Sequence, residues 1–418
     1  MGLFKKYINR ITGCILVLVL VFTVFMISYR ASRVEYGHVK YEQFFNEDTD
    51  YDVMFFGASH TQNGIYPMQL WKDFGITSYN MGGPNCSLPT SYYMLKMAIK
   101  YHKPKIAVLD VILSDKNDII WDYSLAHHYM DAFPLTEEKI EAVNVLFPDT
   151  KAKLEMLFPY YVYHAGWKDI DGEALKKAFS QEHWPTFGAE YESLISSVDA
   201  VPEFVSQDSG NDGIETTGHE YIRKFVELCR ENDIQPMLMF LPAGVDEAEQ
   251  RAANEVYRIA GEMAVPYVNL IYEEGLINYF TDYTDGGGHL NPSGARKVTA
   301  WIGNYLTSNS EVIDHRNDGK YSVLWNETYG KYRDFISNIM KESADARTAL
   351  MNLYNNNYYS YIEISPGYDK DSVDQMLLDQ LTGEGLAEVN TSDSLQTVKI
   401  RIKVTSADTG EEICTLEY

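Results

Sequence analysis

The sequence predicts an α/β protein: a three-layer, doubly wound parallel sheet with one N-terminal transmembrane helix, a helical insertion and a small C-terminal α+β domain. Short apolar runs alternate with amphipathic stretches between residues 51 and 306. These runs are apolar throughout, as strands buried on both faces of a parallel sheet are. A single long uncharged run, Ile11 to Ser28, follows a basic start and predicts the membrane helix.

Five strands and five main helices are expected in the α/β region. The strands are residues 53–56, 76–81, 105–113, 235–241 and 266–270, and the helices are residues 68–73, 88–101, 218–232, 246–264 and 292–306. A strand followed by a crossover helix returns parallel to its predecessor, which predicts a doubly wound sheet. Ligands bind such a sheet at the carboxyl ends of its strands.

The charge of the chain excludes one class of partner. With 35 Lys and Arg against 60 Asp and Glu, the formal net charge is −25. Phosphate backbones are bound by clustered Lys and Arg. We therefore expect no binding to nucleic acid. The 45% hydrophobic content also excludes a disordered chain.

The apolar run is predicted to anchor the protein in the cell membrane. Its 18 uncharged residues would extend about 27 Å as a helix, close to the thickness of the hydrocarbon core. The run is longer than the apolar region of a signal peptide, which favours a retained anchor. Lys5, Lys6 and Arg10 precede it and Arg30 and Arg33 follow it, so the N-terminus is predicted to be cytoplasmic and the body extracytoplasmic.

The expected domain boundaries follow from these patterns. Residues 1–10 are the cytoplasmic N-terminus, 11–29 the transmembrane anchor, 30–48 a juxtamembrane linker, 49–308 the α/β domain and 320–418 the C-terminal domain. Residues 118–209 interrupt the alternation and are expected to be a helical insertion. Two interpretations of it stay open: a helical layer with an aromatic core, or a lid that contacts substrate.

Three polar segments fall where strands end or the last helix begins. Gly57-Ala58-Ser59-His60 follows the first strand, Asn80-Met81-Gly82-Gly83-Pro84-Asn85 follows the second, and Asp285-Gly286-Gly287-Gly288-His289 precedes the last helix. A serine nucleophile needs a base to accept its proton and a carboxylate to orient that base. Ser59, His289 and Asp285 can fill these three roles.

The oxyanion formed by attack at a carbonyl needs hydrogen-bond donors fixed around it. The backbone N–H of Ser59, that of Gly82 or Gly83 and the side-chain amide of Asn85 are the candidates. No Cys or His spacing typical of a metal site is found, so neither a metal nor a cofactor is expected.

These segments resemble the conserved blocks of the SGNH (GDSL-like) hydrolase superfamily, over residues 50–308. The resemblance implies a flavodoxin-like fold, with Ser59 as nucleophile, His289 as base and Asp285 as its orienting carboxylate. It departs from the family in two places. Three residues rather than two separate Asp285 from His289, and the block after the third strand lacks its glycine. Asn117 in that block is therefore a rival to Asn85 as an oxyanion donor.

An anchored, exported domain is similar to the D-alanyl-lipoteichoic acid transfer proteins and the alginate or peptidoglycan O-acetyltransferases. The resemblance implies a serine acyltransferase or esterase that acts on O-acyl groups of a cell-envelope glycan or polymer through an acyl-serine. It also implies a multi-span membrane acyltransferase as partner. One alternative is a non-catalytic accessory protein that binds envelope polymer, and another is a receptor that uses the insertion.

Overall fold

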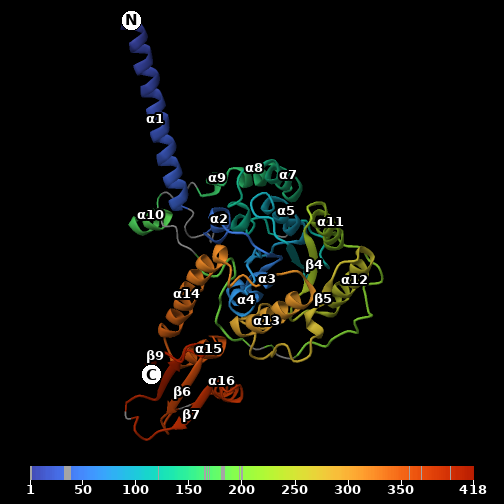
Figure 1. Cartoon of the computed structure of the whole chain (residues 1–418), viewed down its shortest axis with the longest axis vertical. Helices are drawn as coiled ribbons and strands as arrows, with labels where there is room; N and C mark the ends of the chain where they lie inside the picture. The colour runs from blue at the N-terminus through green and yellow to red at the C-terminus, as the bar shows by residue number, and fades with distance from the viewer. Residues whose placement is uncertain are drawn as a thin grey trace. The chain divides into compact units, whose positions relative to one another are not determined.

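The architecture is seen in a computed structural model, which describes residues 2–418 apart from 33–38, 121, 164–165, 167, 169, 180–183, 197, 199–200, 357, 369 and 396. The chain divides into two compact units (Figure 1). Residues 1–47 and 122–184 form the first, and residues 48–121 and 185–418 form the second.

The second unit contains a five-stranded parallel sheet with the strand order β2-β1-β3-β4-β5. The strands are β1 (Val53–Phe56), β2 (Ser78–Asn80), β3 (Ile106–Asp110), β4 (Gln235–Phe240) and β5 (Tyr267–Asn269). This order is that of flavodoxin-like doubly wound sheets. The predicted α/β fold class is therefore confirmed.

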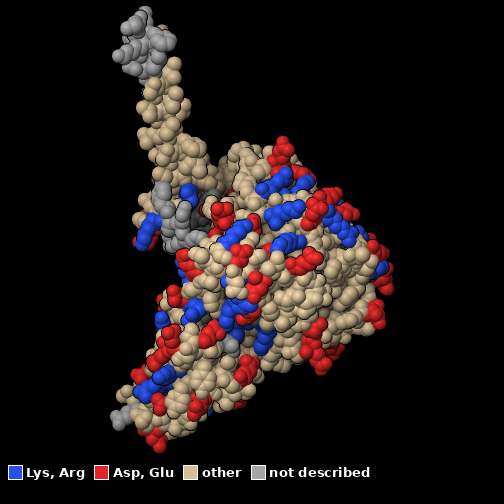
Figure 2. Space-filling view, viewed as in Figure 1, with Lys and Arg blue, Asp and Glu red and all other residues tan. Residues whose placement is uncertain are grey.

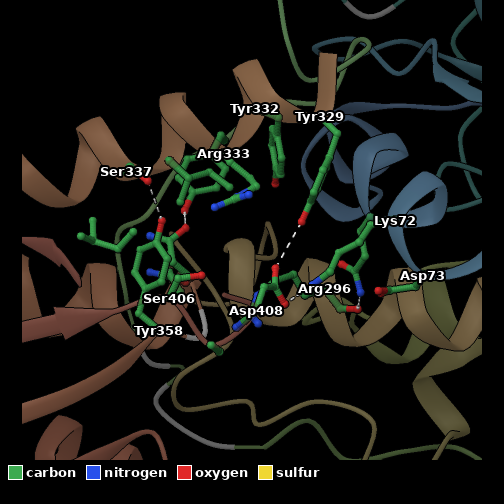
Figure 3. A pocket seen from close by; sticks show the side chains of 17 residues that line it. Lys72, Asp73, Arg296, Tyr329, Tyr332, Arg333, Ser337, Tyr358, Ser406 and Asp408 are labelled. Atoms are coloured by element: carbon green, nitrogen blue, oxygen red, sulfur yellow. Dashed lines mark hydrogen bonds and ion pairs between the residues drawn. The ribbon is translucent and has the colours of Figure 1, made fainter. Parts of the chain in front are cut away.

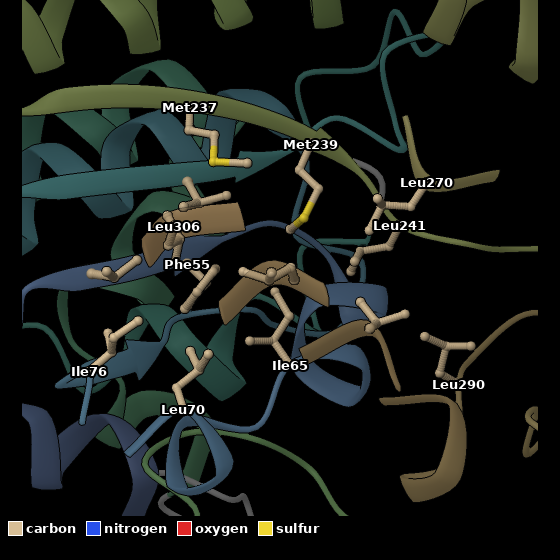
Figure 4. Packing of buried hydrophobic residues seen from close by; sticks show 14 of the residues in the cluster. Phe55, Ile65, Leu70, Ile76, Met237, Met239, Leu241, Leu270, Leu290 and Leu306 are labelled. Carbon is tan, nitrogen blue, oxygen red and sulfur yellow. The ribbon is translucent and has the colours of Figure 1, made fainter. Parts of the chain in front are cut away.

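Helices cover both faces of this sheet. One layer contains α5 (Leu88–Ala98), α11 (Thr217–Glu231) and α12 (Glu247–Met263), and the other contains α3 (Ser59–Gly64), α4 (Pro67–Phe74) and α13 (Pro292–Asn309). The main core lies between the sheet and the second layer, where strand residues such as Phe55, Met237 and Met239 pack with Leu70 and Leu306 (Figure 4). The central strands β1 and β3 also bury their opposite faces, which explains why their sequences are apolar almost throughout.

A smaller α+β region follows in the same unit. Its helices are α14 (Gly319–Lys341), α15 (Ala346–Asn356) and α16 (Ser372–Gly383), and its strands are β6 (Tyr359–Ile364), β7 (Ala387–Thr391), β8 (Ile400–Thr405) and β9 (Glu412–Glu417). The sheet order is β7-β6-β8-β9, parallel between β6 and β7 and antiparallel elsewhere. Among these strands, β7 lacks a continuous apolar sequence, because its residues include charged Glu388 and polar Asn390.

The first unit is helical. It contains α1 (Gly2–Ser32), α2 (Val39–Asn46), α6 (His127–Met130), α7 (Glu137–Leu146), α8 (Thr150–Leu157), α9 (Tyr160–Tyr163) and α10 (Gly172–Phe179). Residues 122–184 of the expected insertion belong to it, whereas residues 185–209 pack with the α/β region. Residues 33–38 of the expected linker lie outside the described residues.

Among the described helices, α1 alone is long and apolar enough to cross a membrane, over Arg10–Ser32. Figure 2 shows part of this helix with neither acidic nor basic side chains on the visible face. Its leucines and valines are exposed in the protein, as expected of side chains that contact lipid. At its end, Phe25 and Tyr29 contact the ring of Tyr160 in α9.

The packing of α13 on α4 gives the first testable prediction. A Cβ at Gly303 would lie 2.2 Å from Cε2 of Phe74, so Gly303→Ala should lower the free energy of unfolding by about 1–3 kcal/mol through overpacking. A Cβ at Gly330 in α14 would meet no neighbouring side chain or element within 4 Å. Gly330→Ala should therefore be neutral or stabilising. Thermal unfolding of the two variants measures both effects. An equal shift of the midpoint in Gly303→Ala and Gly330→Ala would contradict the close packing of α13 on α4.

Candidate active site

Ser59 is the first residue of α3, directly after the turn that leaves β1. The turn is tight because Gly57 has a φ of 155°, and a Cβ there would lie 2.2 Å from Oγ1 of Thr61 and 2.9 Å from Cβ of Asp110. Only glycine fits this position. The turn therefore places Ser59 at the carboxyl edge of the sheet, at the start of a helix.

Asp285 and His289 lie on one short loop before α13. Gly286 and Gly287 have φ values of 75° and 112°, which glycine adopts without strain. The loop closes on itself, because the backbone N–H of His289 donates to Oδ1 of Asp285 at 2.7 Å and Thr284 N–H donates to His289 O at 2.9 Å. The three glycines thus accommodate the extra residue between Asp285 and His289.

The three side chains form a continuous hydrogen-bonded series. His289 Nε2 lies 2.6 Å from Ser59 Oγ, and His289 Nδ1 lies 2.6 Å from Asp285 Oδ2. In the tautomer that suits this series, Nδ1–H donates to the carboxylate and Nε2 accepts from the serine hydroxyl. The side chains of His289 and Asp285 are 28% and 45% exposed, so the series is open to a ligand.

The pKa of Asp285 is lowered from its ordinary value. Burial by itself raises the pKa of this carboxyl, but hydrogen bonds from the imidazole and the backbone N–H of His289 outweigh burial. Asp285 is therefore ionised at neutral pH, in the state that orients and stabilises a protonated His289.

Asn291 holds the Asp285–His289 loop in place. It is fully buried. Its Oδ1 caps α13 by accepting from Ser293 N–H and Gly294 N–H, and its Nδ2 donates to the carbonyls of Thr281 and Tyr283. A buried amide that satisfies donors and acceptors on both sides of a loop fixes the loop rigidly.

Asp282 is the other carboxylate near this loop, and it has a structural role. It is buried, pairs with Lys297 at 2.8 Å and accepts from the hydroxyl of Tyr354 at 3.0 Å. Lys297 therefore balances the charge of Asp282. The carboxylate that contacts the imidazole of His289 is that of Asp285.

Two of the expected oxyanion donors, the backbone N–H groups of Gly82 and Gly83, already have hydrogen-bond acceptors within the protein. Gly82 N–H donates to Oδ1 of Asn80 at 2.9 Å, and Gly83 N–H donates to the carbonyl of Gly57 at 3.2 Å. Both N–H groups are thus engaged in bracing the loop against the Ser59 turn. Neither N–H group is therefore available to donate to an oxyanion in this structure. The sequence could not reveal which acceptors these groups have, because hydrogen-bond partners depend on the fold.

The two rival asparagines, Asn117 and Asn85, differ in their hydrogen bonds. Asn117 Oδ1 accepts from Thr217 N–H at 3.1 Å at the start of α11, and within the described residues it forms no hydrogen bond with Ser59 or His289. Asn85 is half-buried with a φ of 50°. In the part of the chain that the structure describes, its side-chain amide and the backbone N–H of Ser59 have no hydrogen-bond acceptor, so these two candidates remain.

Asn80 is a residue of the site that sequence reasoning missed. It is fully buried at the end of β2. Its Nδ2 donates to the carbonyls of Thr61 at 2.7 Å and Ile65 at 2.9 Å, so it joins the Gly82 loop to α3. The signal was present, since Asn at the end of a buried strand needs partners, but its partners lie earlier in the chain and cannot be inferred from spacing.

His60 was also missed, although it follows Ser59 directly. Its ring stacks on that of His289 with 4.9 Å between centroids and 30° between planes. Its Nδ1 is buried and has no partner within the described residues. Burial, followed by the nearby charge of His289, lowers the pKa of His60 to about 3. His60 is therefore a neutral ring that supports one face of His289.

Asp110 lies beneath the Ser59 turn at the end of β3. It is buried and accepts from Thr61 Oγ1 at 3.1 Å and from Ile112 N–H at 3.3 Å. Burial raises the pKa of Asp110 to about 7, against these hydrogen bonds. A lone acid in an otherwise apolar strand was the sequence signal for it.

The structure gives no indication of a metal site among its described residues, where no three His, Cys, Asp or Glu side chains are grouped to hold an ion. No disulfide is formed within the described residues, which include all four cysteines: Cys14, Cys86, Cys229 and Cys414.

No family model matches this chain, and no curated protein matches it. Among solved structures, the crystal structure of a "putative acylhydrolase" from Bacteroides fragilis NCTC 9343 matches with 13% identity and a TM-score of 0.33, and the match covers 64% of this chain and 94% of that chain. A likeness at this score carries no argument about the function of this chain.

The stack of His60 on His289 predicts a graded response to substitution. His60→Ala removes the support of the imidazole and should slow the reaction of Ser59 with a serine-directed fluorophosphonate about tenfold or more, because small misplacements of reacting groups are costly. His60→Phe keeps a neutral ring and should retain most of the rate. If His60→Phe reacts as slowly as His60→Ala, the stacking role is wrong.

Asp110 predicts a pH-dependent stability. The folded state holds this proton up to about pH 7, whereas an unfolded Asp loses it near pH 4. The folded state therefore binds more protons in this window, and Asp110 lowers stability progressively as the pH rises from about 4 to 7. Asp110→Asn should raise the midpoint of thermal unfolding more at pH 8 than at pH 5. A difference between wild type and variant that is constant with pH would contradict the raised pKa.

Proposed function

We propose that this chain is a membrane-anchored, extracytoplasmic serine esterase or acyltransferase that acts on O-acyl groups of a cell-envelope glycan. The observation that carries the proposal is the unbroken series from Asp285 through His289 to Ser59, with 2.6 Å at each of its two side-chain contacts. Serine acyl-transfer enzymes on unrelated folds use this arrangement of nucleophile, base and orienting carboxylate.

The first half of the reaction forms an acyl-serine. Ser59 Oγ attacks the ester carbonyl while His289 Nε2 accepts the hydroxyl proton, and Asp285 stabilises the imidazolium that results. The negative charge on the carbonyl oxygen is taken up by the backbone N–H of Ser59, with the amide of Asn85 as the second proposed donor. The bond to the leaving alcohol then breaks, and this alcohol leaves with the proton from His289.

The second half returns the enzyme to its starting state. His289 removes a proton from an incoming hydroxyl, whose oxygen attacks the acyl carbon, and Ser59 Oγ regains a proton as the acyl group leaves. A sugar hydroxyl as acceptor makes the enzyme a transferase, and water makes it an esterase. The partly exposed side chains of His289 and Asp285 suit a site that admits a polymer.

The anchor supports the cellular part of the proposal. The apolar helix at Arg10–Ser32 with its basic N-terminal flank favours an N-terminus in the cytoplasm and a body outside. Activated acyl thioesters are made inside the cell, so a transferase of this layout needs a multi-span membrane acyltransferase to deliver its acyl groups.

The alternative is a non-catalytic accessory protein that binds envelope polymer. The wider Asp285 to His289 spacing suggested it. That spacing no longer favours the alternative, because the loop glycines bring the imidazole to 2.6 Å from the carboxylate.

The proposal is tested with the full chain in detergent. A fluorophosphonate should label wild type at Ser59, and aryl acetate should be hydrolysed. Ser59→Ala should abolish both, and Asp285→Asn should slow turnover by at least about 10²-fold. Ser308→Ala, at an exposed serine of α13, is the matched control and should react like wild type. A folded wild type that neither labels at Ser59 nor turns over ester leaves the accessory role as the function.

A further inference from the structure

A cavity of about 320 Å³ lies within the unit formed by residues 48–121 and 185–418. Its walls come from α4, α13, α14, the end of α15 and the turn between β8 and β9 (Figure 3). Neither Ser59, His289 nor Asp285 is among its lining residues. Four tyrosines contribute to the wall: Tyr191, Tyr329, Tyr332 and Tyr358.

Part of the wall is held rigid by its own hydrogen bonds. Lys72 pairs with Asp408 at 2.7 Å, and the hydroxyl of Tyr329 donates to the same carboxylate at 3.3 Å. The hydroxyls of Tyr358 and Ser337 lie 3.3 Å apart. These contacts join α4, α14 and the β8–β9 turn, so the cavity is preformed.

Other polar groups of the wall have no partner. Within the described residues, the guanidinium of Arg333 forms no hydrogen bond or ion pair, and Figure 3 shows it directed into the cavity. Tyr332 is only 7% exposed, and its hydroxyl also points into the cavity without a partner in the described chain. The buried Nε of Arg296 is likewise unsatisfied, although its Nη2 donates to the carbonyl of Tyr354.

Unpaired groups of this kind are costly unless a ligand satisfies them. A half-buried guanidinium loses hydration without gaining a partner, and guanidinium groups bind carboxylate and phosphate in a fixed geometry. Tyrosine rings offer apolar faces and polar edges of the kind that contact both the faces and the hydroxyls of a sugar. The volume is at the lower end of small-ligand sites, which suits one sugar unit rather than a long segment.

We propose that this cavity binds one acidic sugar unit, with Arg333 and Arg296 on its negative group and Tyr332 on a hydroxyl. The inference goes beyond the proposed acyl chemistry, because it needs no reaction at Ser59. The formal net charge of the chain is −25, so the protein as a whole repels anions at long range. Arg333 and Arg296 must therefore attract the negative group of the sugar by direct contact.

The experiment measures binding by calorimetry with the full chain in detergent. The probes are glucuronate, glucose 1-phosphate, glucose and inorganic phosphate. We expect both acidic sugars to bind, and glucose and inorganic phosphate to bind at least about tenfold more weakly. Binding by only one acidic sugar would still support the site and would identify its anion as carboxylate or phosphate. Equal binding of inorganic phosphate, or no binding of either acidic sugar, would overturn the proposal.

Variants locate the binding in the cavity. Arg333→Gln and Tyr332→Phe should each weaken the acidic sugar, Arg333→Gln by about tenfold or more. Lys331→Gln is the matched control, because Lys331 lies on the same helix and pairs outward with Glu327. An unchanged affinity in Arg333→Gln would contradict the assignment. Ser59→Ala should lose turnover but bind the sugar like wild type, so a failure of the acyl chemistry is distinguishable from a failure of this site.

Discussion

The hydrogen bond between Ser59 and His289 joins residues 230 positions apart, and most of the unit from residue 48 onward serves to make it. Ser59 follows the end of β1, whereas His289 comes after β5 and before α13. A parallel sheet gathers the carboxyl ends of its strands at one edge, so the two residues meet although the chain crosses the sheet several times between them. A shift of α13 relative to α3 would separate them, which makes the α13, α3 and α4 layer part of the site.

Two buried asparagines fix the two sides of this contact. Asn80 ties the loop after β2 to α3, and Asn291 ties the loop that carries Asp285 and His289 to the start of α13. Neither forms a hydrogen bond with Ser59 within the described residues. Asp110 and His60 complete the surroundings, the first under the serine turn and the second against the imidazole. Burial keeps His60 neutral, so it adds no repulsion when His289 takes up a proton.

Much of the fold could be predicted from the sequence, because strands buried on both faces have a distinctive apolar pattern. The strand at residues 53–56 matches β1, and the helix expected at 292–306 matches the start of α13. In the C-terminal region the sequence predicted only a mixed α+β domain, and the structure shows where its first two helices separate: α14 ends at Lys341 and α15 begins at Ala346. The short helix α3 was not expected, because six residues with glycine at the end carry no clear period.

The sequence predicted those site residues whose roles follow from their position relative to strands and helices. It could not predict roles that depend on which hydrogen bonds form in the folded chain. Ser59, His289 and Asp285 could be selected because each follows or precedes a predicted element. The occupation of the Gly82 and Gly83 N–H groups depends on where Asn80 and Gly57 lie in space. The cavity lined by Arg333 could not be predicted either, because it is built from segments between residues 69 and 413 that meet only in the folded chain.

In the proposed reaction, Ser59 carries the acyl group between donor and acceptor. Mass spectrometry of the full chain, treated with aryl acetate, quenched in acid and digested, tests this most directly. We expect one acetyl group on the peptide that contains Ser59, and none on the corresponding peptide of Ser59→Ala. Turnover of the ester with no acyl group at Ser59, or an acyl group on another residue that persists in Ser59→Ala, would contradict it.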